Sequence, residues 1–154
     1  MKSRIAAVLT FSFFAPMALA AAPTSCPFSA GELKSALNSE FKEGKVGFES
    51  DFGTGKSLSC RYEGKNMSLV VKQTVMKDPA QTRGWEAGLA GKKEKVANDP
   101  DGALWQVDQG DNTSPNLHYV RNGDIVELRV MGVGKSNAQF EPLQKKLPTL
   151  RRLP

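Results

Sequence analysis

The sequence predicts an α+β fold: a mainly antiparallel sheet, covered by two or three helices and held by one disulfide bond. The first observation is the stretch 58–71, where apolar residues alternate on both sides of a glycine-containing turn, as in a β-hairpin. The second is a well-formed helix start at Ser29, shortly before that hairpin. The third is the placement of the two cysteines. Cys26 precedes the helix and Cys60 lies in the hairpin, so a bond between them joins helix to sheet.

The first 20 residues have the pattern of a signal peptide. A positively charged start precedes an apolar core over residues 5–14, which is too short to span a bilayer, and residues 18–20 form an Ala-Leu-Ala cleavage site. We therefore expect residues 1–20 to be a signal peptide and residues 21–154 to be a single α+β domain. The protein is then periplasmic or secreted, with no transmembrane segment after cleavage. A retained membrane anchor is the alternative, which the short core and the cleavage site disfavour.

Charge and size exclude some classes of protein. The formal net charge of +5 falls to +3 once Lys2 and Arg4 leave with the signal peptide, which is too small an excess for a nucleic-acid binder. The remaining 134 residues can bury a core of their own, which a disulfide then supplements. Two cysteines in an exported chain most simply pair, and closing that loop removes roughly 3.8 kcal/mol of unfolded-chain entropy. A redox-active pair is the alternative, but the C-x-x-C spacing is absent.

The first half of the chain is expected to form one helix followed by three strands. The helix starts at Ser29, whose hydroxyl can cap it, while Glu32 completes the capping box and Gly44 ends the helix. Its apolar stripe consists of Leu33, Leu37 and Phe41. A strand is expected over residues 46–52, and the hairpin strands then extend to about Met76.

The second half is expected to begin with another helix, capped by Asp78. Gly84 and Gly88 each weaken this helix by about 1 kcal/mol relative to alanine, so it should be short and depend on packing. Four strands follow, and the Asn-Gly pair at 122–123 is the strongest hairpin turn in the sequence. These strands are expected over residues 93–96, 103–107, 117–121 and 125–131, with a polar loop over 108–116.

A closing helix is indicated by Leu143, Leu147 and Leu150, which recur at helical spacing. Residues 136–139 offer a capping box before it, and prolines at 142 and 148 should interrupt it.

The two hairpins share one pattern, which indicates two helix-plus-hairpin halves. A shift of 59 residues places five residues of the first hairpin on equivalent residues of the second. Leu58, Gly64, Met67, Leu69 and Val71 fall on Leu117, Gly123, Val126, Leu128 and Val130. Coincidence is the alternative, because any alternating hairpin matches another at some offset.

Candidate binding residues lie around Trp85 and in the polar loop. Trp85 is close to Arg83, and aromatic residues with a neighbouring arginine are typical of interface hot spots. Asp108 and Asp111 belong to the polar loop. His118 is the only histidine, and it falls on the strand face opposite its apolar neighbours, so we expect it to be half exposed. These five residues are the predicted binding site.

No sequence motif indicates catalysis, a metal or a cofactor. Gly-Lys-Ser occurs at 55–57 and 134–136, but the earlier glycine of a phosphate-binding loop is missing from both. Asp99 and Asp101 resemble part of a calcium turn that lacks its bidentate glutamate. A pair of loop carboxylates for hydrolysis can be drawn from the acidic residues, but no spacing selects one pair. We therefore expect no catalytic residue, no metal site and no cofactor.

The capped helix after Cys26, the Cys60-Arg61-Tyr62 strand and the Ala-Leu-Trp segment at 103–105 before an Asn-Gly hairpin together resemble small exported domains of the bacterial envelope. Some of these are similar to the PsbP and Mog1 proteins. The resemblance covers most of residues 21–154 as a pattern only and transfers no active-site residue. It implies an α+β fold and a non-enzymatic accessory or binding role outside the cytoplasm.

The leading hypothesis is an exported, non-catalytic binding protein whose partner is another protein, of the inhibitor or immunity type. Such a protein needs a rigid scaffold and a few anchoring side chains. One alternative is a carrier of a small ligand or lipid, with a core cavity lined by Phe48, Phe52 and Tyr62. The other is an envelope hydrolase that uses loop carboxylates or His118.

Overall fold

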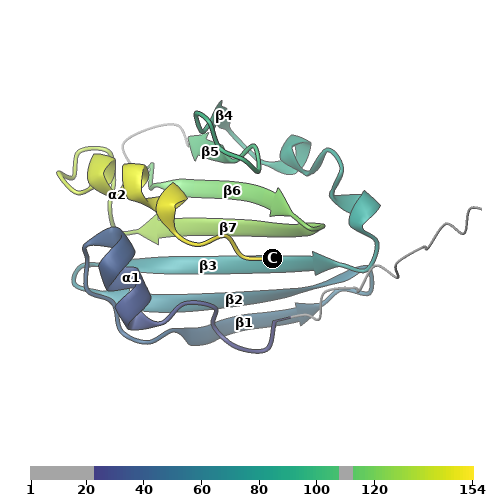
Figure 1. The fold of residues 1–154 in the computed structure, drawn as a ribbon, viewed down its shortest axis with the longest axis horizontal. Coiled ribbons are helices and arrows are strands. Elements are labelled where there is room, and N and C mark those ends of the chain that lie inside the picture. Colours follow the sequence, from purple (N-terminus) through teal and green to yellow (C-terminus); the bar gives the residue numbers. More distant parts are fainter. Residues whose placement is uncertain (1–22, 108–112) are drawn as a thin grey trace, which may run out of the picture.

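The computed structural model describes residues 23–107 and 113–154, and Figure 1 shows their arrangement. The elements in chain order are α1 (Ala30–Leu37), β1 (Lys45–Asp51), β2 (Gly55–Gly64), β3 (Met67–Met76), the 3₁₀ turns η1 (Pro79–Thr82) and η2 (Trp85–Gly88), β4 (Lys92–Lys95), β5 (Leu104–Val107), β6 (Asn116–Arg121), β7 (Asp124–Met131), α2 (Phe140–Lys146) and η3 (Leu147–Thr149). The predicted signal peptide, Asp108 and Asp111 lie outside the described residues.

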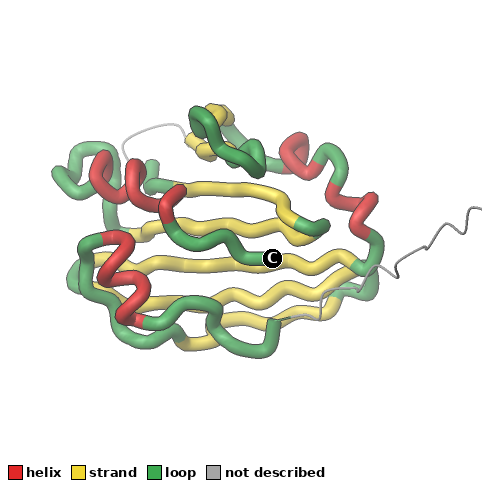
Figure 2. Tube along the Cα trace, in the orientation of Figure 1, coloured by secondary structure: helices red, strands yellow, loops and turns green. Residues whose placement is uncertain are grey.

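The strands form one seven-stranded sheet in the order β1-β2-β3-β7-β6-β5-β4, and every neighbouring pair is antiparallel. The predicted α+β class and antiparallel sheet are therefore confirmed. Both helices and the last residues of the chain lie on one side of the sheet, which we call the covered face (Figures 1 and 2). Within the described ranges, no helix is both long and apolar enough to cross a membrane.

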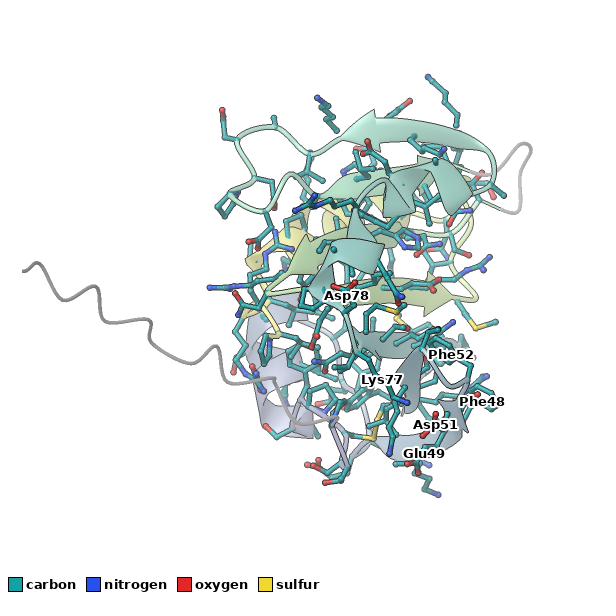
Figure 3. The ribbon with its side chains drawn as sticks, turned by 90° about the vertical axis from the view of Figure 1, so that its right-hand side faces the viewer. Phe48, Glu49, Asp51, Phe52, Lys77 and Asp78 are labelled. Carbon is teal, nitrogen blue, oxygen red and sulfur yellow. A yellow bond between two sulfur atoms is a disulfide. The ribbon has the colours of Figure 1, made fainter. Side chains whose placement is uncertain are left out.

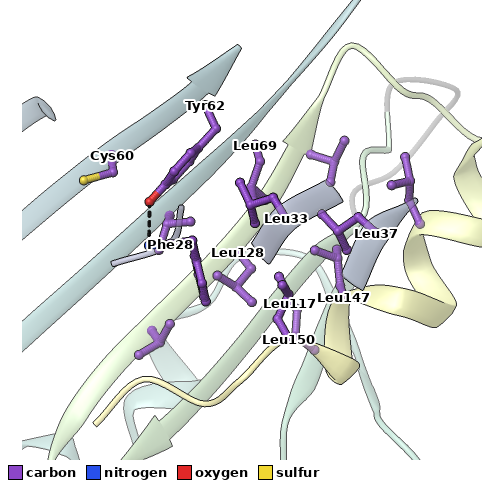
Figure 4. Packing of buried hydrophobic residues seen from close by; sticks show 14 of the residues in the cluster. Phe28, Leu33, Leu37, Cys60, Tyr62, Leu69, Leu117, Leu128, Leu147 and Leu150 are labelled. Atoms are coloured by element: carbon purple, nitrogen blue, oxygen red, sulfur yellow. Dashed lines mark hydrogen bonds between the residues drawn. The ribbon is translucent and has the colours of Figure 1, made fainter. Parts of the chain in front are cut away.

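The covered face carries the hydrophobic core, as the alternation in the sequence predicts. In β2 and β3, the alternate residues Cys60, Tyr62, Leu69 and Val71 are all nearly inaccessible to solvent. Leucines from α1 and from the closing segment pack onto them (Figure 4). The predicted disulfide between Cys26 and Cys60 is present, with the two Cα atoms 5.5 Å apart. It ties the segment before α1 to the second strand.

Helix α1 begins as predicted and ends earlier than predicted. The Ser29 hydroxyl accepts a hydrogen bond from the Glu32 backbone N–H at 3.2 Å, which satisfies one free donor of the first turn. Asn38 adopts a left-handed conformation, with φ of 52°, and ends the helix well before Gly44. Phe41 therefore leaves the helix, although it remains buried and pairs with Gly64 in a short β-bridge.

The second predicted helix is wrong, because residues 79–88 form two separate 3₁₀ turns. Asp78 does cap the first turn, since its carboxylate accepts from the Ala80 backbone N–H at 2.9 Å. Gly84 then takes a left-handed φ of 72°, which interrupts the helical conformation between η1 and η2. The two halves of the chain consequently differ, because α1 lies on the covered face and η2 packs on the opposite face.

The closing helix starts later than predicted. Gln139 makes no side-chain capping bond, and α2 begins at Phe140. Pro142 lies in the first turn, where no N–H is needed, so it does not interrupt α2. Leu143, Leu147 and Leu150 are all buried, as their spacing predicts.

Candidate protein-binding surface

The side of the sheet opposite α1 and α2, which we call the open face, carries a row of side chains that runs from β1 to β6. In this row Phe48 is opposite Ser59, Ser59 is opposite Lys72, Lys72 is opposite Glu127, and Glu127 is opposite His118. At roughly 4.8 Å per strand, the row is about 19 Å long. An aromatic side chain stands at each end of it, Phe48 at one and Trp85 over the other.

At the β6 end, Trp85 of η2 packs against His118. Their ring centroids are 6.1 Å apart, with an angle of 35° between the planes. The structure thus brings together two residues that the sequence analysis singled out separately. His118 is only 3% exposed, so the expectation that it is half exposed is wrong. The pattern of a strand shows which face a residue occupies, but the cover here comes from η2, a segment distant in sequence.

A hydrogen-bond network fixes the position of His118. The Gln106 side-chain oxygen accepts from Asn116 Nδ2 at 3.0 Å and contacts His118 Nε2 at 2.9 Å. Because an amide oxygen only accepts, His118 Nε2 carries the proton. The Gln106 Nε2 amide donates to the Ala90 carbonyl at 2.9 Å, which ties the segment after η2 to the sheet. His118 therefore serves as a rigid support beneath Trp85.

A shallow groove lies beside the Trp85–His118 pair, with a volume of about 260 Å³. The groove is lined by the aromatic pair together with aliphatic, hydroxyl and charged side chains, a composition that suits contact with protein side chains. Its lining comprises Lys72, Thr74, Trp85, Gly88, Leu89, His118, Ile125 and Glu127.

At the β1 end, aromatic side chains are exposed to solvent. Phe48 is 57% exposed and Phe52 is 46% exposed, and both lie on the side away from the helices (Figure 3). With Val46, they supply three of the four large apolar side chains that are exposed in the described ranges. Tyr62 is buried on the covered face, so these residues do not line a common cavity. The carrier hypothesis therefore loses the residues on which it rested.

The middle of the open face is polar and carries both basic and acidic side chains. Lys72 is exposed and takes part in none of the ion pairs within the described residues. Beside it, Arg61 pairs with Glu63 of its own strand. The hydroxyls of Ser57 and Thr74 bond to each other at 2.7 Å across β2 and β3. Aromatic ends around a polar centre are the arrangement of a protein interface with separate anchoring residues.

Among the other predicted binding residues, Arg83 is exposed between η1 and η2, and its backbone N–H donates to the Ala80 carbonyl at 3.1 Å. Asp108 and Asp111 cannot be placed, since they fall in the undescribed segment. The sequence pattern does not indicate that Phe48 and Phe52 are exposed at the surface, and the structure shows that they are. A signal for them was the glycine at 47, because a glycine inside a strand often marks a β-bulge and bulges are over-represented at sheet edges.

The acidic pair Asp99 and Asp101 is engaged by an arginine. Asp99 Oδ1 accepts from the backbone N–H groups of Asp101 and Ala103 at 3.0 and 3.1 Å, while Asp99 Oδ2 contacts the Arg152 guanidinium. The Asp99 side chain is only 2% exposed. This carboxylate therefore has a structural role, and residues 23–107 and 113–154 contain no group of three potential metal-ligating side chains.

The chain matches no protein-family model, no curated protein and no solved structure. The resemblance to envelope domains of the PsbP and Mog1 type therefore remains a prediction.

Proposed function

We propose that this protein is an exported, non-catalytic domain of the bacterial envelope that binds another protein through its open face, as an inhibitor or immunity protein does. The observation that carries the proposal is the row from Phe48 to Glu127, which lies on the open face between an exposed phenylalanine and the Trp85–His118 pair. The disulfide supports an oxidising location such as the periplasm or the cell exterior.

The physical reasoning starts from the aromatic side chains. Exposed Phe48 loses contact with water when a partner covers it, which is favourable at about 25 cal/mol per Å² of apolar surface. Trp85 is already held by His118, so little side-chain freedom is lost when it binds. Lys72 between them favours an acidic side chain on the partner. The sheet provides the rigid support that a blocking protein requires.

The hydrolase alternative is weaker for His118 and Asp99, because both of these described residues already have structural partners. His118 Nε2 donates to Gln106, and Asp99 is held by Arg152 and two backbone N–H groups. A general base must reach a substrate proton, which a buried and committed carboxylate does poorly.

The test is affinity capture from envelope and culture supernatant with the exported, oxidised protein as bait, followed by mass spectrometry. We expect one protein partner at a stoichiometric level. Phe48→Ser and Lys72→Glu should each weaken its binding by about tenfold or more, as hot-spot substitutions do. Glu141→Ala, an exposed position on α2 of the covered face, is the matched control and should leave binding unchanged.

Three outcomes contradict the proposal. If no protein is captured, or a lipid or small molecule is recovered in its place, the binding-protein function is wrong. If a partner binds all three variants equally, the open face is not the binding surface. If turnover of an envelope substrate is found and is lost in His118→Ala, the protein is an enzyme.

A further inference from the structure

We propose that the partner contacts the open face through acidic side chains, which bind a basic corner of the sheet beside Phe48. The basic corner consists of Lys45, Arg61 and Lys72, from β1, β2 and β3. This inference rests on the proposed function, since it names the chemistry of the partner that the open face binds. The reasoning starts from an irregularity of β1 at Gly47.

A β-bulge at Gly47 determines which face Phe48 occupies. The register of β1 against β2 shifts between Val46 and Phe48, so three residues of β1 are matched by only two of β2, Ser59 and Cys60. Regular alternation would place Val46 and Phe48 on one face, whereas the extra residue puts Phe48 opposite Ser59, on the open face. Bulges re-aim side chains in this way and are frequent beside functional sites. Here the bulge turns an aromatic ring onto the open face, where it is 57% exposed.

Strand β1 also separates its charges by face. Lys45 is directly opposite Arg61 and therefore lies on the open face, next to Phe48. Glu49 is opposite Leu58, a core residue, so its carboxylate lies on the other side of the strand. The open side of β1 thus carries a cation and an aromatic ring, and no acidic residue of the same strand lies beside them.

The basic corner places like charges close together. Lys45 and Arg61 are directly opposite on neighbouring strands, which puts their Cβ atoms about 5 Å apart, and like charges in such a pair destabilise a sheet. Lys72 adds a third cation, diagonal to Arg61 at about 7–8 Å. A carboxylate of a partner placed between these groups relieves the repulsion. The corner therefore favours an anionic ligand.

The protein's own carboxylates offset only part of this charge. Arg61 pairs with Glu63 of its own strand, and both side chains are half exposed. Lys45 and Lys72 take part in no ion pair within the described part of the chain, although Glu127 is opposite Lys72 in the register. Two of the three cations therefore remain available to carboxylates of a partner.

The spacing of these groups specifies the contact segment of the partner. Phe48 and Lys72 are two strands apart, at about 10 Å, and Lys45 lies about 7 Å from Phe48 along the strand direction. An apolar side chain on the Phe48 ring, with carboxylates one or two residues away on each side, contacts all of these groups at once. The ring then loses contact with water, and each carboxylate accepts a charge-assisted hydrogen bond. An acidic loop or strand with a central apolar residue has this chemistry.

The experiment is a titration of the exported, oxidised protein with the capped pentapeptide Asp-Glu-Phe-Glu-Asp, followed by the NMR signals of the backbone amides. We expect shifts confined to β1, β2 and β3 around the basic corner. Lys45→Glu and Arg61→Glu should each weaken peptide binding by about tenfold. Lys93→Glu is the control, because it makes the same charge change on the open face of β4, and it should bind the peptide as the wild type does.

A second peptide tests whether charge is the cause. Lys-Lys-Phe-Lys-Lys should bind the double variant Lys45→Glu/Arg61→Glu and not the wild type, because both partners then have exchanged signs. The inference is overturned if the acidic peptide shifts no signal at the highest concentration, if the lysine peptide shifts the wild type equally, or if both single reversals bind the acidic peptide at full strength. Signals that respond to phosphatidylglycerol vesicles and not to the acidic peptide would assign the corner to a membrane surface, which also overturns it.

The two proposals fail separately. A captured protein partner whose binding is insensitive to both reversals, together with no response to the peptide, retains the proposed function and rejects the acidic contact. A peptide that binds the basic corner when no protein is captured rejects the proposed function and retains the ligand chemistry of the corner.

Discussion

The sheet has two flanks, the β1 side and the β4 side, and each is joined to a segment that crosses the covered face. The kind of bond that joins them differs between the two flanks. On the β1 side, the Cys26–Cys60 disulfide joins the lead of α1 to β2. On the β4 side, Arg152 of the closing segment pairs with Asp99 and Asp101, just before β5. A covalent bond resists changes of salt and pH but not reduction, whereas a buried ion pair is indifferent to redox conditions. The two flanks should therefore fail under different stresses.

Each flank also contains a buried tyrosine with the same role. Tyr62 accepts a hydrogen bond from the Phe28 backbone N–H at 2.9 Å (Figure 4), and Tyr119 accepts one from the Leu153 backbone N–H at 3.0 Å. In both cases the partners are 34 residues apart. The Arg152 guanidinium lies over the Tyr119 ring, 4.4 Å from its centroid. The same type of hydrogen bond is therefore found on both flanks. The disulfide reinforces it on the β1 side, and the charged Arg152 reinforces it on the β4 side.

The edges of the two flanks differ as well. Strand β1 exposes Val46 and Phe48, while β4 exposes three lysines in four residues. Lysines on an edge strand oppose pairing with another strand, because like charges repel and each lysine keeps its hydration. The β4 edge is thus protected against association by its lysines, whereas β1 leaves two large apolar side chains exposed and is interrupted by a β-bulge at Gly47.

Loss of the disulfide should have the largest effect. Replacing both Cys26 and Cys60 with serine should lower the free energy of unfolding by about 4 kcal/mol, from the entropy of the freed loop. Urea unfolding of the oxidised and reduced wild type should give nearly the same difference. A change below about 1 kcal/mol would show that the covalent bond is not what holds the β1 flank.

Breaking the ion pair between Arg152 and Asp99 on the β4 flank should have the second-largest effect on stability. Arg152→Met should cost about 3 kcal/mol, because it leaves a buried carboxylate without its counter-ion. The variant Arg152→Met/Asp99→Asn should recover part of this loss. Urea unfolding of Arg152→Met with the disulfide intact and reduced should show the same decrement, since distant sites add. A decrement that disappears on reduction would mean that the flanks are not independent.

The two tyrosine hydroxyls should contribute equally to the free energy of unfolding, and each should contribute less than the Arg152 ion pair. Tyr62→Phe and Tyr119→Phe each leave one buried backbone N–H without its acceptor, at a cost of about 1–2 kcal/mol. Thermal unfolding of the two variants measures both costs under one condition. If Tyr119→Phe costs far more than Tyr62→Phe, the Arg152 guanidinium depends on the hydroxyl, and the two flanks are less alike than their geometry indicates.

Asp124, on a strand between the flanks, should give the smallest effect and one that depends on pH. Burial raises the pKa of Asp124, although the amide of Gln73 at 2.8 Å opposes that rise. A carboxyl with a raised pKa in the folded state stabilises the fold most below its unfolded pKa, and that contribution is lost as pH rises through the folded pKa. Asp124→Asn should therefore be more stable than the wild type at pH 7, with a smaller advantage at pH 3. Chemical denaturation at both pH values tests this, and an advantage independent of pH would contradict it.

The local part of the fold could be predicted from sequence. The alternation through Cys60 and Leu69 predicts both hairpin strands, and the capping pattern at Ser29 predicts the start of α1. Local sequence signals did not predict where helices end, because left-handed backbone conformations at single residues determine those ends. Asn38 and Gly84 take left-handed conformations that end α1 and divide the second predicted helix, and composition does not reveal which such residue will do so.

The candidate binding surface could be predicted only in part. Trp85 and His118 were each singled out, but their contact joins segments that only the folded sheet brings together. The carrier alternative places Phe48 in a core cavity, because alternation separates the two faces of a strand without showing which face the helices cover. Sequence patterns therefore identify side chains with contact potential, and the placement of the helices decides which of them remain exposed.

The burial of the closing segment has a consequence for the timing of folding. Leu147, Leu150 and Leu153 supply part of the core, and Leu153 follows Cys60 by 93 residues. A chain that emerges N-terminus first, from a ribosome or a translocation channel, thus presents both cysteines long before its core can close. Oxidation can then precede final packing, so the sulfur bridge restrains an unfinished intermediate while the later strands are still being delivered. Trapping nascent chains at increasing lengths would reveal whether the bridge is indeed the first tertiary contact to form.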